Sequence, residues 1–188
     1  ISYYSNRTQF DGDALEKRGL GGSESCLINL TRAIKELLPN SEITVYNGVR
    51  TSKEYNGIIY KSHNDFISEC RNFNQDVFIS LRDTEPFMLP YIDAKIKVVH
   101  SQDDLNEPGL QNLQRSPYAR ENVDFFLAIS EYAKGEIQKG FPEKKVYLQR
   151  NGYNDKLIDK DNFYKPRSPI AVYSSTPYRG LDILTEVW

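Results

Sequence analysis

The feature that most constrains the fold is an alternation of short apolar runs with stretches of helical periodicity along the 188 residues. Several runs are apolar at every position, which is typical of strands covered on both faces. The runs predicted to form strands are 1–4, 43–46, 57–60, 76–80, 96–99, 124–130, 145–149 and 170–174. Strands that alternate with helices favour an α/β fold built on a doubly wound, mostly parallel sheet.

Two of the intervening helices carry clear start and stop signals. The first begins near Ser23, places apolar side chains such as Leu27 and Ile34 on one stripe, and ends at the Leu-Pro-Asn sequence 38–40. The second follows Ser130, a favoured N-cap residue, and ends at Lys-Gly-Phe-Pro. Together with the strands, these helices predict a Rossmann-like domain.

Composition narrows the function classes. A net charge of −2 gives no broad basic surface, so binding of nucleic acid is not expected. No apolar run is long enough for a transmembrane segment. Cys26 and Cys70 are too few for a disulfide framework or a cysteine-based metal site, and Cys26 is expected to be a buried, reduced thiol on its helix. We expect a cytoplasmic protein; peripheral attachment to a membrane stays open.

A glycine-rich turn precedes the first long helix. Gly19, Gly21 and Gly22 lie in four positions, followed by Ser23. Glycine lets a ligand approach the backbone closely, and a helix N-terminus offers free N–H groups, so the turn suits a phosphate or another anion. A flexible loop with an ordinary serine cap is the alternative. A dinucleotide site, as in an oxidoreductase, is less favoured because the spacing is G-x-G-G and the connection from the first strand is long.

The chain divides into two predicted parts. The segment 150–168 is polar, charged and rich in turn residues, as expected of a linker. After it come one strand, one polar loop and one helix start, which are too few to cover their own apolar faces. We therefore predict a domain over 1–165 and the first β-α unit of a second, truncated domain over 166–188.

The chain resembles the amino-terminal half of a GT-B glycosyltransferase of the retaining family 4 type, also called glycosyl transferases group 1. The resemblance covers the whole chain, and it rests on four stretches that occur in the family's order. These are GLGGSE (19–24), SLRDTEPF (80–87), FLAISEYAKGEIQKGFPEKKVYLQRNGYN (126–154) and AVYSSTPYRGLDILTEVW (171–188).

This resemblance implies two Rossmann-like domains across a cleft. The first domain would bind the acceptor, which is a glycan, a lipid or another molecule, and the second would hold a nucleotide sugar as substrate rather than as a cofactor. By the resemblance, Gly21, Gly22, Ser23 and Arg179 would contact the donor diphosphate. The fragment alone would be inactive, because most of the donor site would lie beyond it. The resemblance implies no metal bound by a carboxylate pair of the enzyme.

Further site candidates follow two of the strands. The family often places a histidine near the reacting sugar in the loop that corresponds to 97–104, so His100 and Asp103 are the expected catalytic pair. Two registers stay open, because Gln102 could occupy the position instead of His100. Arg82 and Gln102 are expected to line the acceptor side of the cleft. Each of these loop residues could instead be an ordinary solvated side chain.

The sequence thus predicts an enzyme that transfers a sugar with retention of configuration. One alternative is a non-catalytic module that binds an acceptor or another protein. The third candidate is the dinucleotide-binding domain of an oxidoreductase. A longer reading frame with the family's carboxylate pair would favour the enzyme.

Overall fold

A computed structural model describes residues 1–5, 8–152, 165–166, 168–170, 172–173 and 180–187. The chain forms two compact units, Ile1–Gly152 and Tyr153–Trp188. The boundary between the units falls at the start of the predicted linker 150–168. In the second unit the described residues contain one helix, α7 (Leu181–Val187), where a helix start was predicted.

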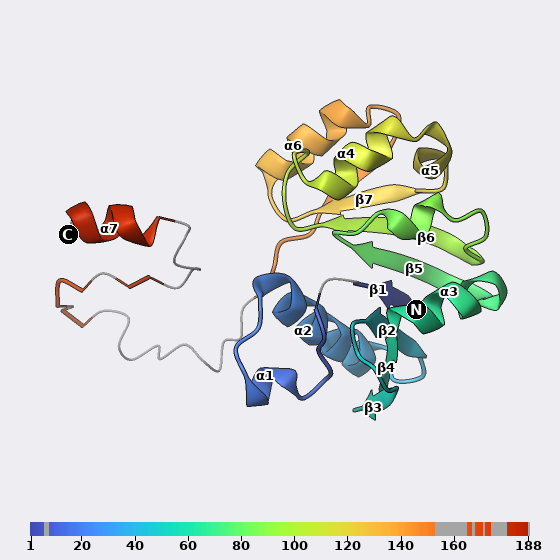
Figure 1. Cartoon of the computed structure of the whole chain (residues 1–188), viewed down its shortest axis with the longest axis horizontal. Helices are drawn as coiled ribbons and strands as arrows, with labels where there is room; N and C mark the ends of the chain where they lie inside the picture. Colours follow the sequence, from blue (N-terminus) through green and yellow to red (C-terminus); the bar gives the residue numbers. More distant parts are fainter. Residues whose placement is uncertain (6–7, 153–164, 167, 171, 174–179, 188) are drawn as a thin grey trace. The chain divides into compact units, whose positions relative to one another are not determined.

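The first unit is built on an eight-stranded sheet with the order β3-β4-β2-β1-β5-β6-β7-β8. Figure 1 shows this order running from β7 near the top of the view to β3 at the bottom. Every neighbouring pair is parallel except β3 and β4. The strands are β1 (Ser2–Tyr4), β2 (Ile43–Asn47), β3 (Lys53–Tyr55), β4 (Ile58–Ser62), β5 (Gln75–Leu81), β6 (Ala94–Ser101), β7 (Phe125–Ala128) and β8 (Lys145–Leu148).

The helices of this unit connect the strands, so the predicted Rossmann-like, doubly wound α/β fold is confirmed. Two short 3₁₀ helices, Cys70–Asn72 and Glu85–Met88, accompany them. The α-helices are α1 (Ala14–Lys17), α2 (Gly22–Leu37), α3 (His63–Glu69), α4 (Pro108–Arg115), α5 (Pro117–Glu121) and α6 (Glu131–Gly140). The helix predicted near Ser23 begins one residue earlier, at Gly22, and the helix predicted after Ser130 begins at Glu131, with Ser130 as its N-cap.

Seven of the eight predicted strands are present. The predicted run 124–130 is too long at its end, because the strand stops at Ala128 before the N-cap of α6. In the eighth run, 170–174, positions 171 and 174 lie outside the described residues, and 170, 172 and 173 are not in a strand. β3 was not predicted.

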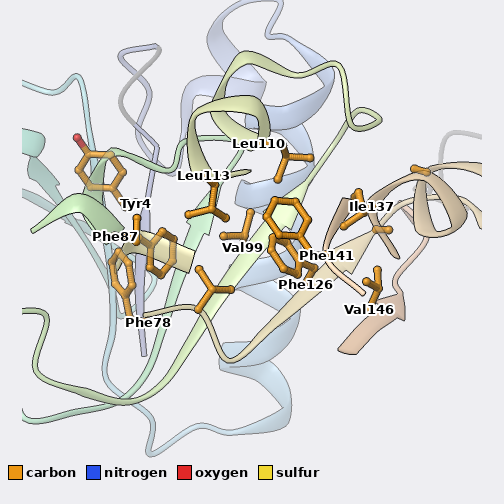
Figure 2. Close-up of a cluster of buried hydrophobic side chains, with 14 of the residues drawn as sticks. Tyr4, Phe78, Phe87, Val99, Leu110, Leu113, Phe126, Ile137, Phe141 and Val146 are labelled. Atoms are coloured by element: carbon orange, nitrogen blue, oxygen red, sulfur yellow. The ribbon is translucent and has the colours of Figure 1, made fainter. Parts of the chain in front are cut away.

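Successive side chains of each strand point to opposite faces, so the sheet has two separate cores. Tyr3 belongs to the core that packs against α1 and α2, whereas the next residue, Tyr4, belongs to the core that packs against α3, α4, α5 and α6. Figure 2 shows the second core, in which the rings of Phe126 and Phe141 lie together with their centroids 4.6 Å apart. Burial on both faces explains the fully apolar strand sequences.

The strand order reverses direction next to β1. From β1 the chain proceeds to β2 and β4 on one side, and then crosses to β5 on the other side. In open α/β sheets, ligands bind at such a switch point, outside the carboxyl ends of the strands. The residues that follow β1, β5 and β6 are therefore the place to look for a site. Among the described residues, no helix has the length and apolar character needed to cross a membrane.

Candidate functional site

The N-terminus of α2 lies in the connection that follows β1. Gly21 is the N-cap, with φ −64° and ψ 159°, so it needs no left-handed backbone. Glu24, three residues later, accepts a hydrogen bond from Thr8 at 2.9 Å. A Cβ atom placed on Gly21 would lie 2.3 Å from Oε2 of Glu24, which shows that this carboxylate lies against the first turn. An incoming anion would therefore compete with Glu24 for the helix N-terminus.

Gly22 has a different environment from Gly21. A Cβ atom placed on Gly22 would meet nothing within 4 Å among the described atoms. The space beside this residue is therefore open, and the packing of the domain gives no reason for a glycine here. Such a position leaves room for a ligand to approach the backbone closely.

Arg82 joins three segments at the switch point. It follows β5 directly, and its φ of 63° is in the left-handed region. Its guanidinium donates from Nε to Glu107 at 2.9 Å and from Nη2 to Asp103 at 2.6 Å. Nη1 donates to Ser23 Oγ of α2 at 3.4 Å. The predicted site residues Ser23, Arg82 and Asp103 thus form one contact chain across α2, β5 and the loop after β6.

Glu107 supplies the buried counter-charge for Arg82. Its side chain is 1% exposed, and it also accepts a hydrogen bond from Ser101 Oγ at 3.2 Å. Burial raises the pKa of the Glu107 carboxyl above its usual range, although the Arg82 guanidinium opposes this shift. Asp103, in contrast, has a side chain that is 49% exposed, so it is the carboxylate of this pair that a ligand can reach.

His100 and Gln102 lie at the end of β6 and just beyond it. His100 is 1% exposed, and its Nε2 atom lies 2.9 Å from Nε2 of Gln102. Burial lowers the pKa of His100 to about 4, so the imidazole is neutral at pH 7. A neutral, enclosed ring can orient a neighbour through a hydrogen bond but carries no charge for a substrate. Gln102 is 9% exposed and lies next to it.

Sequence reasoning missed a structural partner of this pair. Asn151, which lies in the predicted linker 150–168, donates from Nδ2 to Gln102 Oε1 at 2.9 Å. Its Oδ1 accepts a hydrogen bond from the Cys26 thiol of α2 at 3.1 Å. Cys26 is free and only partly buried, which corrects the expectation of full burial. No local signal could have revealed these contacts, because 125 residues separate Cys26 from Asn151.

The structure therefore brings eight predicted or newly found side chains to one edge of the sheet. These are Ser23, Cys26, Arg82, His100, Gln102, Asp103, Glu107 and Asn151. Ser23 and Cys26 are three residues apart on α2 and share a face of that helix. Through them, α2 joins the Arg82 contacts to the His100 contacts. Arg179 lies outside the described residues. Among the described residues, no group of three histidine, cysteine or acidic side chains could hold a metal ion.

A surface hollow of about 420 Å³ lies elsewhere and shares no residue with this site. Arg32 pairs with Glu16 at 2.8 Å there and lies 5.6 Å from the ring centroid of Tyr55, so its charge is already compensated. The residues that line the hollow are Glu16, Arg32, Lys35, Glu36, Tyr55 and Asn56.

Comparisons of this chain with family models, with curated proteins and with solved structures find no match. The function must therefore be argued from the site itself.

Proposed function

We propose that this chain is the acceptor-side part of a retaining glycosyltransferase, which transfers a sugar from a nucleotide-sugar donor to an acceptor. The observation that supports it best is the contact chain of Ser23, Arg82 and Asp103 at the switch point of the sheet. Ligands of open α/β sheets bind at this place. The sequence resemblance supplies the reaction class, and the site geometry is compatible with it.

The charge balance of the site favours a neutral, hydroxyl-bearing ligand on the acceptor side. Arg82 is already paired with Asp103 and Glu107, so this place offers little net positive charge to a free phosphate. Guanidinium, carboxylate and amide groups together provide both donors and acceptors. A sugar hydroxyl, which donates and accepts, matches such a set. Asp103 is the group that we assign to accept from it.

The donor diphosphate is proposed to approach the first turn of α2, near Gly21, Gly22 and Ser23. The open space beside Gly22 supports this assignment. The carboxylate of Glu24 would have to leave the helix N-terminus before a diphosphate could bind there. Arg179 is proposed as a further diphosphate contact on the sequence resemblance alone.

Catalysis in this proposal rests on orienting the donor and stabilising the departing diphosphate. His100 is assigned a supporting role, because its neutral ring contacts Gln102 and is almost completely enclosed. No cofactor is required, since the nucleotide sugar is itself a substrate. The long connection from β1 to α2, which contains α1, differs from the direct strand-to-helix turn of a dinucleotide site.

Asp103→Asn tests the proposal in the full reading frame that contains this sequence. The amide keeps the shape of the carboxylate but loses its charge, so we expect sugar transfer to fall roughly tenfold to a hundredfold for a lost charge-assisted bond. Transfer is measured with a panel of labelled nucleotide sugars and simple acceptors. Asp76→Asn is the matched control, because Asp76 pairs with Lys95 on the surface.

The outcomes separate the candidate functions. If the Asp103→Asn variant transfers sugar at the same rate as the parent, Asp103 does not bind the acceptor. Sugar binding without transfer by the parent would indicate a non-catalytic acceptor-binding module. Absence of both binding and transfer across the panel would reject the proposal.

A further inference from the structure

Four side chains form a continuous hydrogen-bonded row behind the candidate site. The Cys26 thiol donates to Asn151 Oδ1 at 3.1 Å, and Asn151 Nδ2 donates to Gln102 Oε1 at 2.9 Å. Gln102 Nε2 then lies 2.9 Å from His100 Nε2. The row joins α2, the segment after β8 and the end of β6. Each amide uses its oxygen toward the thiol and its nitrogen toward the histidine.

The direction of the row fixes where its protons lie. A half-turn of an amide exchanges its oxygen and nitrogen, so the direction depends on the donor at the end of the row. In the structure the Cys26 thiol donates to Asn151 Oδ1. Burial raises the pKa of Cys26, although a hydrogen bond with Gln102 opposes this shift. Because Gln102 Nε2 always donates, Nε2 of a neutral His100 must accept. The single proton of the ring is then on Nδ1.

We propose that Asn151 is a positioning residue, which orients the amide of Gln102 and thereby holds His100 in the tautomer protonated on Nδ1. Its effect on catalysis rests on the proposed function, whereas the tautomer itself does not. Nδ1 of His100 is buried and has no hydrogen-bond partner among the described residues, so no contact at Nδ1 selects the tautomer. The proposed tautomer leaves its N–H group unpaired, and the hydrogen bonds of the row must offset that cost.

The first test needs no variant. The chain contains two histidines, His63 and His100, so long-range ¹H–¹⁵N NMR spectra of the 188-residue protein at pH 7 are simple to assign with a His63→Gln variant. At this pH the ring of His100 is neutral. We expect the proton on Nδ1 in roughly tenfold excess or more, since the other tautomer would oppose two donors. A proton found mainly on Nε2 would overturn the proposal.

Asn151→Asp tests the residue that the proposal names. The new carboxylate can only accept, so the Gln102 amide must turn and donate to it. The oxygen of Gln102 then faces His100, and the ring proton should move from Nδ1 to Nε2. Asn29→Asp is the matched control, because Asn29 is on the same helix as Cys26 and its side chain donates to Ser25 O, outside the row. The control should keep the proton on Nδ1.

A second variant covers the case in which Asn151→Asp does not fold. Gln102→Glu places an acceptor against His100 directly, so Nε2 should again carry a proton. A folded variant of either kind that keeps the proton only on Nδ1 would overturn the proposal. Transfer assays on the full reading frame complete the test. If a variant has the His100 proton on Nε2 and still transfers sugar at the parental rate, Asn151 does not contribute to catalysis. If the parent transfers no sugar, the proposed function fails while the NMR result still decides the tautomer.

Discussion

Arg82 has an unusual backbone for its residue type. Its φ of 63° lies in the left-handed region, which costs a residue with a Cβ atom about 1–2 kcal/mol. Asn56 and Asn74 also have positive φ, but asparagine tolerates this region well. Three hydrogen bonds to Ser23, Asp103 and Glu107 hold the Arg82 side chain in place. Strain that is retained at the end of a strand agrees with a role at a binding site.

His100 should make the stability of the protein depend on pH. Its pKa is about 4 in the folded protein, against 6.5 for an ordinary histidine, because burial disfavours the charged ring. As the pH falls through 6.5, the unfolded chain takes up a proton that the folded protein does not bind. Folding stability attributable to His100 is therefore complete above this range and is lost as the pH falls toward 4.

The free energy of unfolding of the parent should decrease between pH 7 and about pH 4.5. We predict that this decrease is roughly 2–3 kcal/mol smaller in the His100→Gln variant. Urea unfolding of the parent and the variant at both pH values gives the four free energies required. Comparing differences between pH values cancels any effect of the substitution on packing. A variant that loses as much stability on acidification as the parent would show that His100 is not buried as a neutral ring.

Sequence reasoning selected candidate residues that lie together in the structure, but it did not find their partners. Ser23, Arg82, Gln102 and Asp103 stand at strand or helix ends, where local pattern marks them, and the structure brings them to one edge. Asn151 could not be found in this way, because its role depends on contacts with residues far away in the chain. Contacts between distant residues are in general hard to predict from local sequence, because strand register and helix packing determine which side chains meet.

At the scale of elements, seven strands were predictable from their apolar runs. For strands inside the sheet, such as β1 and β2, burial on both faces leaves such a run. β3 was not predicted, because its sequence, Lys-Glu-Tyr, is polar and the strand lies at an edge of the sheet. A signal was nevertheless present, since Asn56 and Gly57 form an Asn-Gly turn with φ of 51° and 74°. Such a pair favours a tight hairpin and predicts an antiparallel strand before β4.

A substitution in the first turn of α2 tests whether the fold requires Gly22. We predict that Gly22→Ala leaves the fold intact and raises its stability by about 0.4–1 kcal/mol, because alanine restricts the unfolded chain and meets no atom within 4 Å. Gly57→Ala is the contrasting control, since φ there is 74° and the new methyl group would lie 2.8 Å from Lys35 Cε. Thermal melts measure both effects. Destabilisation by Gly22→Ala would mean that the fold, rather than a ligand, requires this glycine.

At the scale of the whole molecule, the described members of both hydrophobic cores lie in the first unit. Their buried residues run from Tyr3 to Val146, and none of the described residues of the second unit is among them. The described part of the second unit instead carries exposed apolar side chains. These are Ile170, Val172, Ile183 and Val187. Exposed apolar groups that gather on a surface promote association between molecules.

We predict that a chain ending at Gly152 folds by itself. It keeps both cores, all eight described strands and Asn151, so its thermal melt should stay cooperative and within about 4 °C of the parent. It should also self-associate less, since it lacks the exposed apolar residues of the second unit; light scattering over a concentration series measures this. Loss of the cooperative melt would show that residues after Gly152 complete a core of the first unit. That result would also place the domain boundary later in the chain, nearer to the predicted division at 165.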